Sequence, residues 1–218
     1  MSIKENLKHI QSQLPEQVTL VAVSKTKPVS DLMEAYDAGQ RIFGENRIQE
    51  MAEKYEEMPK DIQWHAIGHV QRNKVKYMAE FVSLIHGVDS LKLLKEINKQ
   101  AENYDRTISC LLQIKIAEED SKFGMDAKDA ENILSSDAFS KLKNVKIAGV
   151  MGMATFTDDD TQIKKEFDRL QSIFEHLATL NPDLKTISMG MSGDYKEAVN
   201  LNSTHIRVGT FLFGARNV

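Results

Sequence analysis

The chain repeats one unit along its length: a short apolar run, a turn, and then a longer segment with helical spacing. Eight apolar runs predict strands over 18–24, 41–45, 62–68, 81–88, 108–117, 145–154, 185–191 and 205–214. A helix is predicted over 3–14, and a helical segment follows every run except the last. Several runs are continuously apolar, which is typical of parallel strands covered on both faces. Strict strand–helix alternation predicts an α/β fold.

Eight repeats within 218 residues favour a single (β/α)₈ barrel, the TIM barrel, with a leading N-terminal helix. A doubly wound open sheet is the alternative, but the chain lacks the GxGxxG turn of dinucleotide-binding sheets. The 4 prolines and 11 glycines do not cluster into a linker anywhere in the sequence. We therefore expect one domain over residues 1–218.

The charge balance limits the classes of partner. With 28 basic and 32 acidic residues the net charge is −4, which argues against a broad surface for nucleic acid or anionic membranes. A lone cysteine, Cys110, excludes an intramolecular disulfide and a cysteine metal cluster, and indicates a reducing compartment. The N-terminus does not resemble a signal peptide, and no run approaches the roughly 20 apolar residues of a membrane span. We predict a cytoplasmic location.

The last two apolar runs carry the strongest site signal. MGMSGDY places Ser192 and Gly193 before a short helix, and RVGT places Gly209 and Thr210 in the eighth run. Barrels often bind phosphate with the loops after strands seven and eight. Glycines allow the backbone to approach phosphate oxygens, and hydroxyl groups add hydrogen-bond donors. Capping of the short helix by Ser192 or Asp194 would explain the same residues, so both interpretations stand at this point. In either case we expect Asp194 to cap the helix, because a carboxylate beside a phosphate is repelled.

Lys25 follows the first apolar run, where a barrel would direct its side chain into the mouth. A lysine in a desolvated site loses its proton readily and can attack a carbonyl to form a Schiff base. A solvated lysine at a strand end is the plainer interpretation. His65 and His69 are four residues apart but have no HExxH motif around them, so we predict no metal site. A lysine and a phosphate site across one mouth predict a phosphorylated aldehyde as ligand.

Six stretches in the same order resemble one known family. They are AVSKTKP (22–28), DAGQRIFGENRIQE (37–50), WHAIGHVQRNK (64–74), SKFGM (121–125), SMGMSGDYKEAV (188–199) and STHIRVGTFLFGAR (203–216). With them the chain resembles, over nearly its whole length, the pyridoxal phosphate (PLP) homeostasis proteins, also called the proline synthetase co-transcribed homologue family. The resemblance implies a barrel like the N-terminal domain of alanine racemases.

The resemblance also implies roles for particular residues. Lys25 would form the Schiff base with PLP, and Arg207 falls where an arginine faces the pyridine nitrogen. An arginine cannot give up a proton, so that nitrogen stays unprotonated and the ring is a poorer electron sink. The expected cofactor-binding residues are Lys25, Asn46, Met153, Ser192, Gly193, Arg207, Gly209 and Thr210.

Three functions remain open at the level of sequence. The resemblance implies a PLP-binding protein that limits free PLP and delivers it to apo-enzymes, with no catalytic residue, as a monomer or weak homodimer. A PLP-dependent amino-acid racemase is the alternative, but alanine racemases take one acid/base tyrosine from a second domain. The sequence ends at Val218, so we expect no such domain here. A Schiff-base aldolase acting on a sugar phosphate would use the same lysine and phosphate site.

Overall fold

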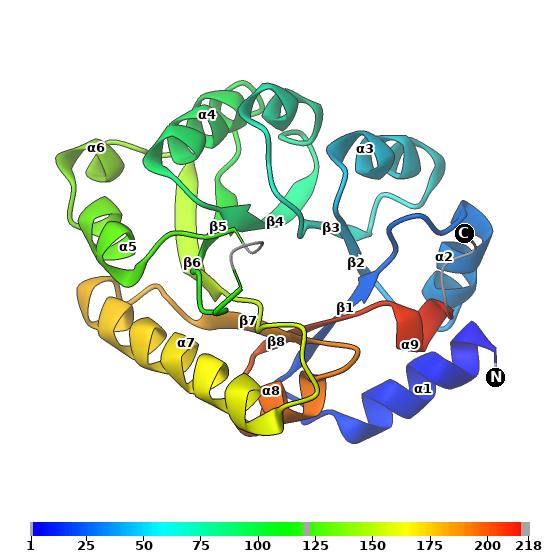
Figure 1. The fold of residues 1–218 in the computed structure, drawn as a ribbon. Coiled ribbons are helices and arrows are strands. Elements are labelled where there is room, and N and C mark those ends of the chain that lie inside the picture. The colour runs from blue at the N-terminus through cyan, green and yellow to red at the C-terminus, as the bar shows by residue number, and fades with distance from the viewer. Residues whose placement is uncertain (1, 120–122, 215–218) are drawn as a thin grey trace.

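Eight parallel strands close into a barrel in chain order, and β1 pairs with β8 to complete it (Figure 1). The structure is a computed structural model that describes residues 2–119 and 123–214. The strands are β1 (Thr19–Val23), β2 (Ile42–Glu45), β3 (Gln63–Ala66), β4 (Val82–Val88), β5 (Ile108–Gln113), β6 (Val145–Met151), β7 (Thr186–Met191) and β8 (His205–Val208). The predicted (β/α)₈ barrel is confirmed.

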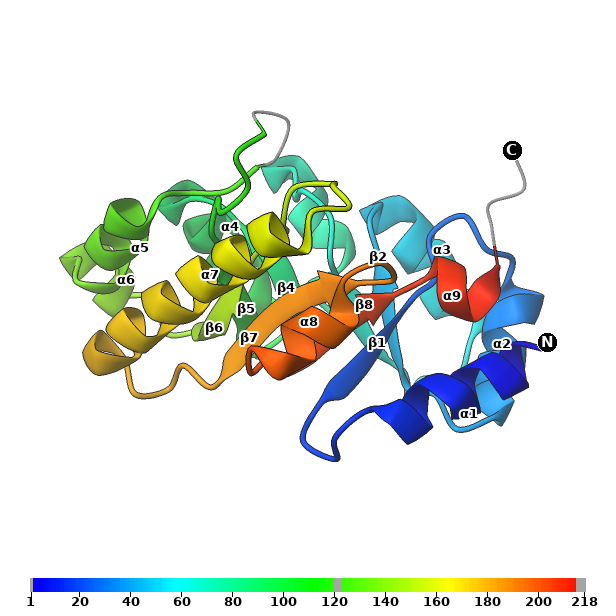
Figure 2. The same cartoon turned by 60° about the horizontal axis from the view of Figure 1, so that its bottom comes forward.

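Helices surround the barrel on its outer side (Figure 1). They are α1 (Ile3–Gln13), α2 (Val29–Asp37), α3 (Ile48–Glu57), α4 (Leu91–Glu102), α5 (Ala127–Leu134), α6 (Asp137–Ser140), α7 (Asp160–Leu180), α8 (Tyr195–Asn200) and α9 (Thr210–Phe213), with a 3₁₀ helix η1 (Arg72–Tyr77). The predicted leading helix is α1, and it packs against α2 and α9 (Figure 2). None of the described helices is long and apolar enough to cross a membrane.

Local sequence signals define where the helices begin. Ser2 and Glu5 form a reciprocal capping box on α1, in which each side chain accepts a hydrogen bond from the other residue's backbone N–H. Asp159 accepts from the backbone N–H groups of Thr161 and Gln162 at the start of α7. These bonds satisfy donors that have no partner within the helix itself.

Two strands and the chain's last apolar run differ from the prediction. The predicted strands 108–117 and 145–154 end early, at Gln113 and Met151, where the chain leaves the sheet to form the loops of the mouth. The predicted strand 205–214 is wrong in its second half, because β8 ends at Val208 and the short helix α9 follows. Leu212 and Phe213 are buried in that helix, so burial rather than strand pairing explains the apolar run.

The barrel separates two interiors of different character. The main core lies between barrel and helices and is apolar, with Trp64, Phe43 and Phe167 among its largest fully buried side chains. Cys110 belongs to this core, and burial raises the pKa of its thiol. Alternate residues of a strand face opposite sides of the sheet. The opposite face carries a small apolar cluster of Leu84, Leu111 and Met151, and polar side chains described below.

Candidate functional site

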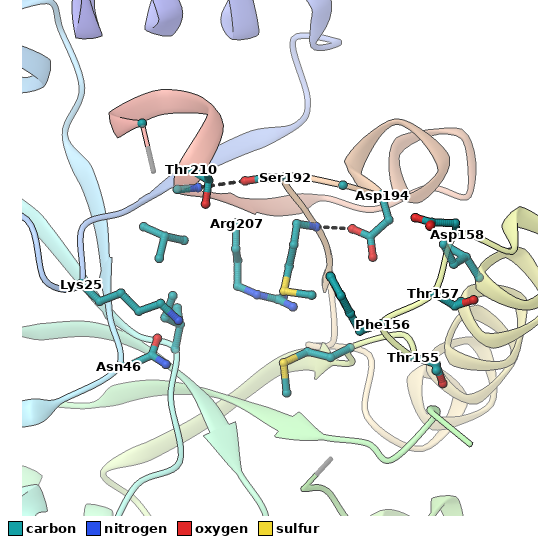
Figure 3. Close-up of a pocket in the computed structure, with 18 of the residues that line it drawn as sticks. Lys25, Asn46, Thr155, Phe156, Thr157, Asp158, Ser192, Asp194, Arg207 and Thr210 are labelled. Carbon is teal, nitrogen blue, oxygen red and sulfur yellow. Dashed lines mark hydrogen bonds between the residues drawn. The ribbon is translucent and has the colours of Figure 1, made fainter. Parts of the chain in front are cut away.

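A cavity of about 440 Å³ opens where the strands end, at the mouth of the barrel (Figure 3). This volume is within the usual range for small-molecule sites. The residues predicted from sequence all line it: Lys25, Asn46, Met153, Ser192, Gly193, Arg207, Gly209 and Thr210. The structure therefore brings the predicted set together in one cavity, although residues from six different segments contribute to it. Their roles toward a ligand remain predictions.

The Lys25 side of the cavity rests on the backbone of the β1–α2 loop. Lys25 is partly buried, and its side chain points into the cavity beside Asn46 (Figure 3). The next residue, Thr26, has a φ of +63°, a left-handed conformation that is unfavourable for a β-branched residue. Its backbone N–H donates to the Glu50 carboxylate at 2.6 Å, and the Ser24 carbonyl accepts from Lys54 Nζ at 2.8 Å. Side chains from outside the loop thus fix the residues on either side of Lys25.

These two side chains belong to a buried ion cluster, defined here as Glu45, Glu50 and Lys54. Lys54 Nζ lies 2.7 Å from Glu45 Oε1 and 2.8 Å from Glu50 Oε1. The Ser24 hydroxyl also donates to Glu45 Oε1, at 2.6 Å. Burial raises the pKa of Glu45, and its hydrogen bonds with Lys54 and Ser24 oppose that shift. The cluster was not predicted from sequence, although Glu50 and Lys54 have the i,i+4 spacing of a helical ion pair.

The opposite side of the cavity is built from backbone and hydroxyl groups. Ser192 and Gly193 follow β7, and Gly209 and Thr210 follow β8. The Gly209 N–H donates to Ser192 Oγ at 3.3 Å (Figure 3). A Cβ at Gly209 would lie 3.1 Å from both the Cβ and the carbonyl oxygen of Val23, so the chain after β8 approaches the end of β1 closely there. We call Ser192, Gly193, Gly209 and Thr210 the hydroxyl–amide wall.

The predicted capping role of the Asp194 side chain is wrong. Asp194 stands at the N-cap position of α8, but its side chain makes no capping bond to that helix. Its carboxylate instead accepts a hydrogen bond from the Met191 backbone N–H at 2.5 Å (Figure 3). The Asp194 carboxylate is therefore bound by the backbone at the end of β7. Ser192 likewise bonds to Gly209 across the two loops rather than to α8, so helix capping does not explain these residues.

Arg207 projects from β8 toward the centre of the cavity (Figure 3). Its side chain donates to Ser188 Oγ at 2.5 Å and to the Gly152 carbonyl at 3.1 Å. Only 4% of the residue is exposed, and burial lowers the pKa of its guanidinium to about 10. The group is therefore still positively charged at neutral pH, and two fixed acceptors hold it in place.

The β6–α7 loop forms a third side, of which the sequence predicted Met153 but not Phe156, Thr157 or Asp158. Residues 155–158 line the cavity, and the ring of Phe156 is 92% exposed at its mouth. Glu166 fixes this loop, because its carboxylate accepts from the Thr155 N–H and hydroxyl, both at 2.7 Å. The same carboxylate accepts from the Glu118 N–H at 3.1 Å, which ties the β5–α5 loop to it. These hydrogen bonds lower the pKa of Glu166 although burial opposes them.

Comparison with known proteins agrees with the predicted resemblance. The family model "Alanine racemase, N-terminal domain" matches residues 1–217. The pyridoxal phosphate homeostasis protein of Vibrio alginolyticus is 37% identical and aligns with 99% of this chain and 98% of its own. The chain belongs to the pyridoxal phosphate homeostasis protein family. Another member, from Escherichia coli K12, is 35% identical over 93% of this chain and 88% of its own.

Solved structures in this family have the same fold. PipY of Synechococcus elongatus PCC7942, with PLP bound, is 37% identical and superposes with a TM-score of 0.90 over 98% of this chain and all (100%) of that chain. Alanine racemase from E. faecalis shares 16% identity, with a TM-score of 0.81 over 99% of this chain and 58% of that chain. The likeness to the racemase shows a common barrel only. Of the family stretches, 121–122 and 215–216 lie outside the described residues.

Proposed function

We propose that this protein binds PLP in the cavity, covalently through Lys25, limits free PLP and delivers it to apo-enzymes without catalytic turnover. One observation carries the proposal: a lysine amine and the hydroxyl–amide wall occupy different sides of one cavity of about 440 Å³. Two further findings support it. The relatives are named as PLP homeostasis proteins, and PipY was solved with PLP bound.

The residues of the cavity fit the parts of PLP. The hydroxyls of Ser192 and Thr210 and the close loop approach at Gly209 suit a phosphate group, which needs donors and tolerates little bulk. Lys25 would hold PLP through its amine, because condensation of an amine with an aldehyde forms a C=N bond and releases water. The Asp194 carboxylate, which would repel a phosphate, is bonded to the Met191 N–H.

Arg207 would set the electronic state of the bound ring. A guanidinium has only donors, so against a pyridine nitrogen it favours the unprotonated ring. An unprotonated ring withdraws electrons weakly, which disfavours the carbanion chemistry that PLP enzymes perform.

Tyrosine placement adds no support for a racemase. Tyr195 begins α8 close to the mouth in sequence, but its hydroxyl donates to Gln13 Oε1 of α1 at 2.9 Å. Within residues 2–119 and 123–214, no tyrosine lines the cavity.

The same range contains no group of three or more His, Cys, Asp or Glu side chains placed to hold a metal ion.

The test is an absorption spectrum of the purified protein with PLP, followed by borohydride reduction and peptide mass mapping. We expect a yellow protein with a pyridoxyl mass on the Lys25 peptide. Lys25→Ala should lose this mass and keep weaker, phosphate-dependent binding. Lys27→Ala is the matched control, because Lys27 also lines the cavity but donates to the Phe213 carbonyl at 3.0 Å. A reduced adduct at wild-type level in Lys25→Ala would refute the assignment, and failure to take up PLP would favour the sugar-phosphate aldolase.

Delivery needs a separate test. The loaded protein should reactivate an apo-enzyme in the presence of a phosphatase that destroys free PLP, and reactivation that the phosphatase abolishes would contradict direct transfer. We further propose that residues 1–218 act as one domain, as a monomer or weak homodimer in the cytoplasm. A single cooperative urea transition, sedimentation velocity and cell fractionation test these three points.

A further inference from the structure

A line of buried polar side chains runs from Arg207 into the barrel interior. Ser188 Oγ lies 2.5 Å from an Arg207 guanidinium nitrogen and 2.9 Å from His86 Nδ1. On the other side of the same ring, His86 Nε2 lies 3.1 Å from His65 Nδ1. The four residues come from β8, β7, β4 and β3, and each is at most 4% exposed. The function proposed above uses only the first of them.

The chemistry of the groups fixes the direction of these hydrogen bonds. Arginine can only donate, so Ser188 Oγ accepts from Arg207. The serine hydroxyl then has one hydrogen to donate. Among the described residues, its recorded partners are Arg207 and His86 alone. If His86 donated from Nδ1, the serine hydrogen would be buried without an acceptor, which is strongly unfavourable. Ser188 therefore donates to His86 Nδ1.

The same reasoning extends to the second histidine. With Nδ1 as acceptor, a neutral His86 carries its proton on Nε2 and donates it to His65 Nδ1. Burial lowers the pKa of both rings, that of His65 to about 3, so both are neutral at physiological pH. His205 stacks on His65 with ring centroids 6.1 Å apart, but it makes no recorded hydrogen bond to these four residues.

We infer that His86 is a positioning residue that acts through Ser188 to hold the Arg207 guanidinium toward the bound ligand. By taking the serine hydrogen, His86 turns a serine lone pair toward Arg207, which fixes one end of the guanidinium. The remaining donor capacity of that group is then directed into the cavity. The ligand half of this inference rests on the proposed function, in which the Arg207 donor meets the ring nitrogen of PLP.

The first experiment needs no ligand. Two-bond ¹H–¹⁵N correlation spectra of the ¹⁵N-labelled full chain at pH 7 should show both His86 and His65 neutral with the proton on Nε2. His86→Asn and His65→Asn assign the signals by their loss. A His86 ring that is protonated, or that carries its proton on Nδ1, would overturn the inference. This result stands or falls independently of PLP binding.

The second experiment measures PLP affinity and the absorption spectrum of bound PLP. His86→Leu removes the acceptor of the Ser188 hydrogen, and we expect a three- to tenfold loss of affinity, the scale of one hydrogen bond. We also expect its spectrum to shift as the ring nitrogen loses its fixed donor. His86→Asn, whose Oδ1 lies near the former Nδ1, should restore both. His205→Asn is the matched control and should bind PLP like wild type. His205 is another histidine of the barrel interior, but it is not one of the four hydrogen-bonded side chains.

The possible results separate the two claims. Wild-type protein that binds no PLP would refute the proposed function while leaving the tautomer result intact. Wild-type affinity and spectrum in His86→Leu would refute the positioning role. Equal losses in His86→Leu, His86→Asn and His205→Asn would also refute it, because they would indicate a general packing effect. Should His86→Leu fail to fold by circular dichroism, Ser188→Ala provides the same test.

Discussion

Lys25 and Ser192 line the same cavity, but different forces hold the two sides. The loop that carries Lys25 is fixed by the buried ion cluster of Glu45, Glu50 and Lys54, which bonds to the backbone next to the lysine. The hydroxyl–amide wall is held by backbone geometry and one hydroxyl contact, from the Gly209 N–H to Ser192. Charge thus positions the Lys25 amine, and close backbone approach shapes the wall that we propose binds phosphate. We expect the ion cluster to fail as a whole when one charge is removed. The hydroxyl–amide wall should instead lose ligand affinity by degrees as bulk is added.

The largest expected effect comes from breaking the ion cluster. Lys54→Met leaves two carboxylates without their shared cation, and loss of one partner of a buried pair typically costs about 3–5 kcal/mol. We expect a loss of this size in the free energy of unfolding, measured by urea denaturation at pH 7. Lys60→Met is the control, because its pairing with Glu56 at 4.0 Å is exposed and worth at most about 1 kcal/mol. Equal losses in the two variants would show that the buried cluster contributes no more to stability than the exposed pair does.

Acid should lower the free energy of unfolding through the buried histidines of the barrel interior. Burial lowers the pKa of His65 to about 3 and that of His205 to about 4, against an ordinary value near 6.5. The unfolded chain therefore binds protons first as pH falls, so this stability is complete above about pH 6.5 and is lost toward pH 4. At about 1.4 kcal/mol per pKa unit, these shifts correspond to about 3 kcal/mol for His205 and about 5 kcal/mol for His65 when fully expressed. Urea denaturation at pH 7 and pH 5 measures the loss, and His65→Asn should reduce it.

A methyl group at Gly209 tests the hydroxyl–amide wall. The new Cβ would lie 3.1 Å from the Cβ and carbonyl oxygen of Val23, so the wall must shift by a few tenths of an ångström. For Gly209→Ala we expect PLP affinity to fall about tenfold, equivalent to about 1.4 kcal/mol. Borohydride labelling of Lys25 at saturating PLP should be unchanged. If labelling at saturation also failed, the two sides would not be independent.

The smallest effect on PLP affinity is expected at Gly193, in the loop after β7. Gly193 also lines the cavity, but a Cβ there would meet nothing within 4 Å. Gly193→Ala should therefore change PLP affinity by less than about twofold, since ordinary surface substitutions stay within about 0.5 kcal/mol. Isothermal titration of both glycine variants compares them directly. A larger loss of affinity in Gly193→Ala than in Gly209→Ala would mean that the phosphate lies closer to the loop after β7 than to the loop after β8.

Sequence predicted the parts of the molecule that follow from periodicity and motif. The strand–helix repeat was sufficient for the barrel, because few folds accommodate eight such units. The eight predicted residues of the cavity were found because they follow strands or match family stretches, whereas Phe156, Thr157 and Asp158 carry no such signal. The ends of β5, β6 and β8 were missed, since an apolar run does not reveal whether its residues pair or pack. The hydrogen bonds of Lys54 and Glu166 were missed because their partners lie in other segments, and charged helix residues usually face solvent.

The closed hydrogen bonding of the barrel, with β1 paired to β8, has a consequence for encounters with other proteins. Every described strand has a neighbour on both sides, so the sheet offers no edge to which a foreign strand could add. This protects the protein from the edge-to-edge aggregation that threatens open sheets. If the protein delivers PLP as proposed, an apo-enzyme would have to dock on the helices and loops of the mouth, by side-chain recognition rather than by pairing with a strand.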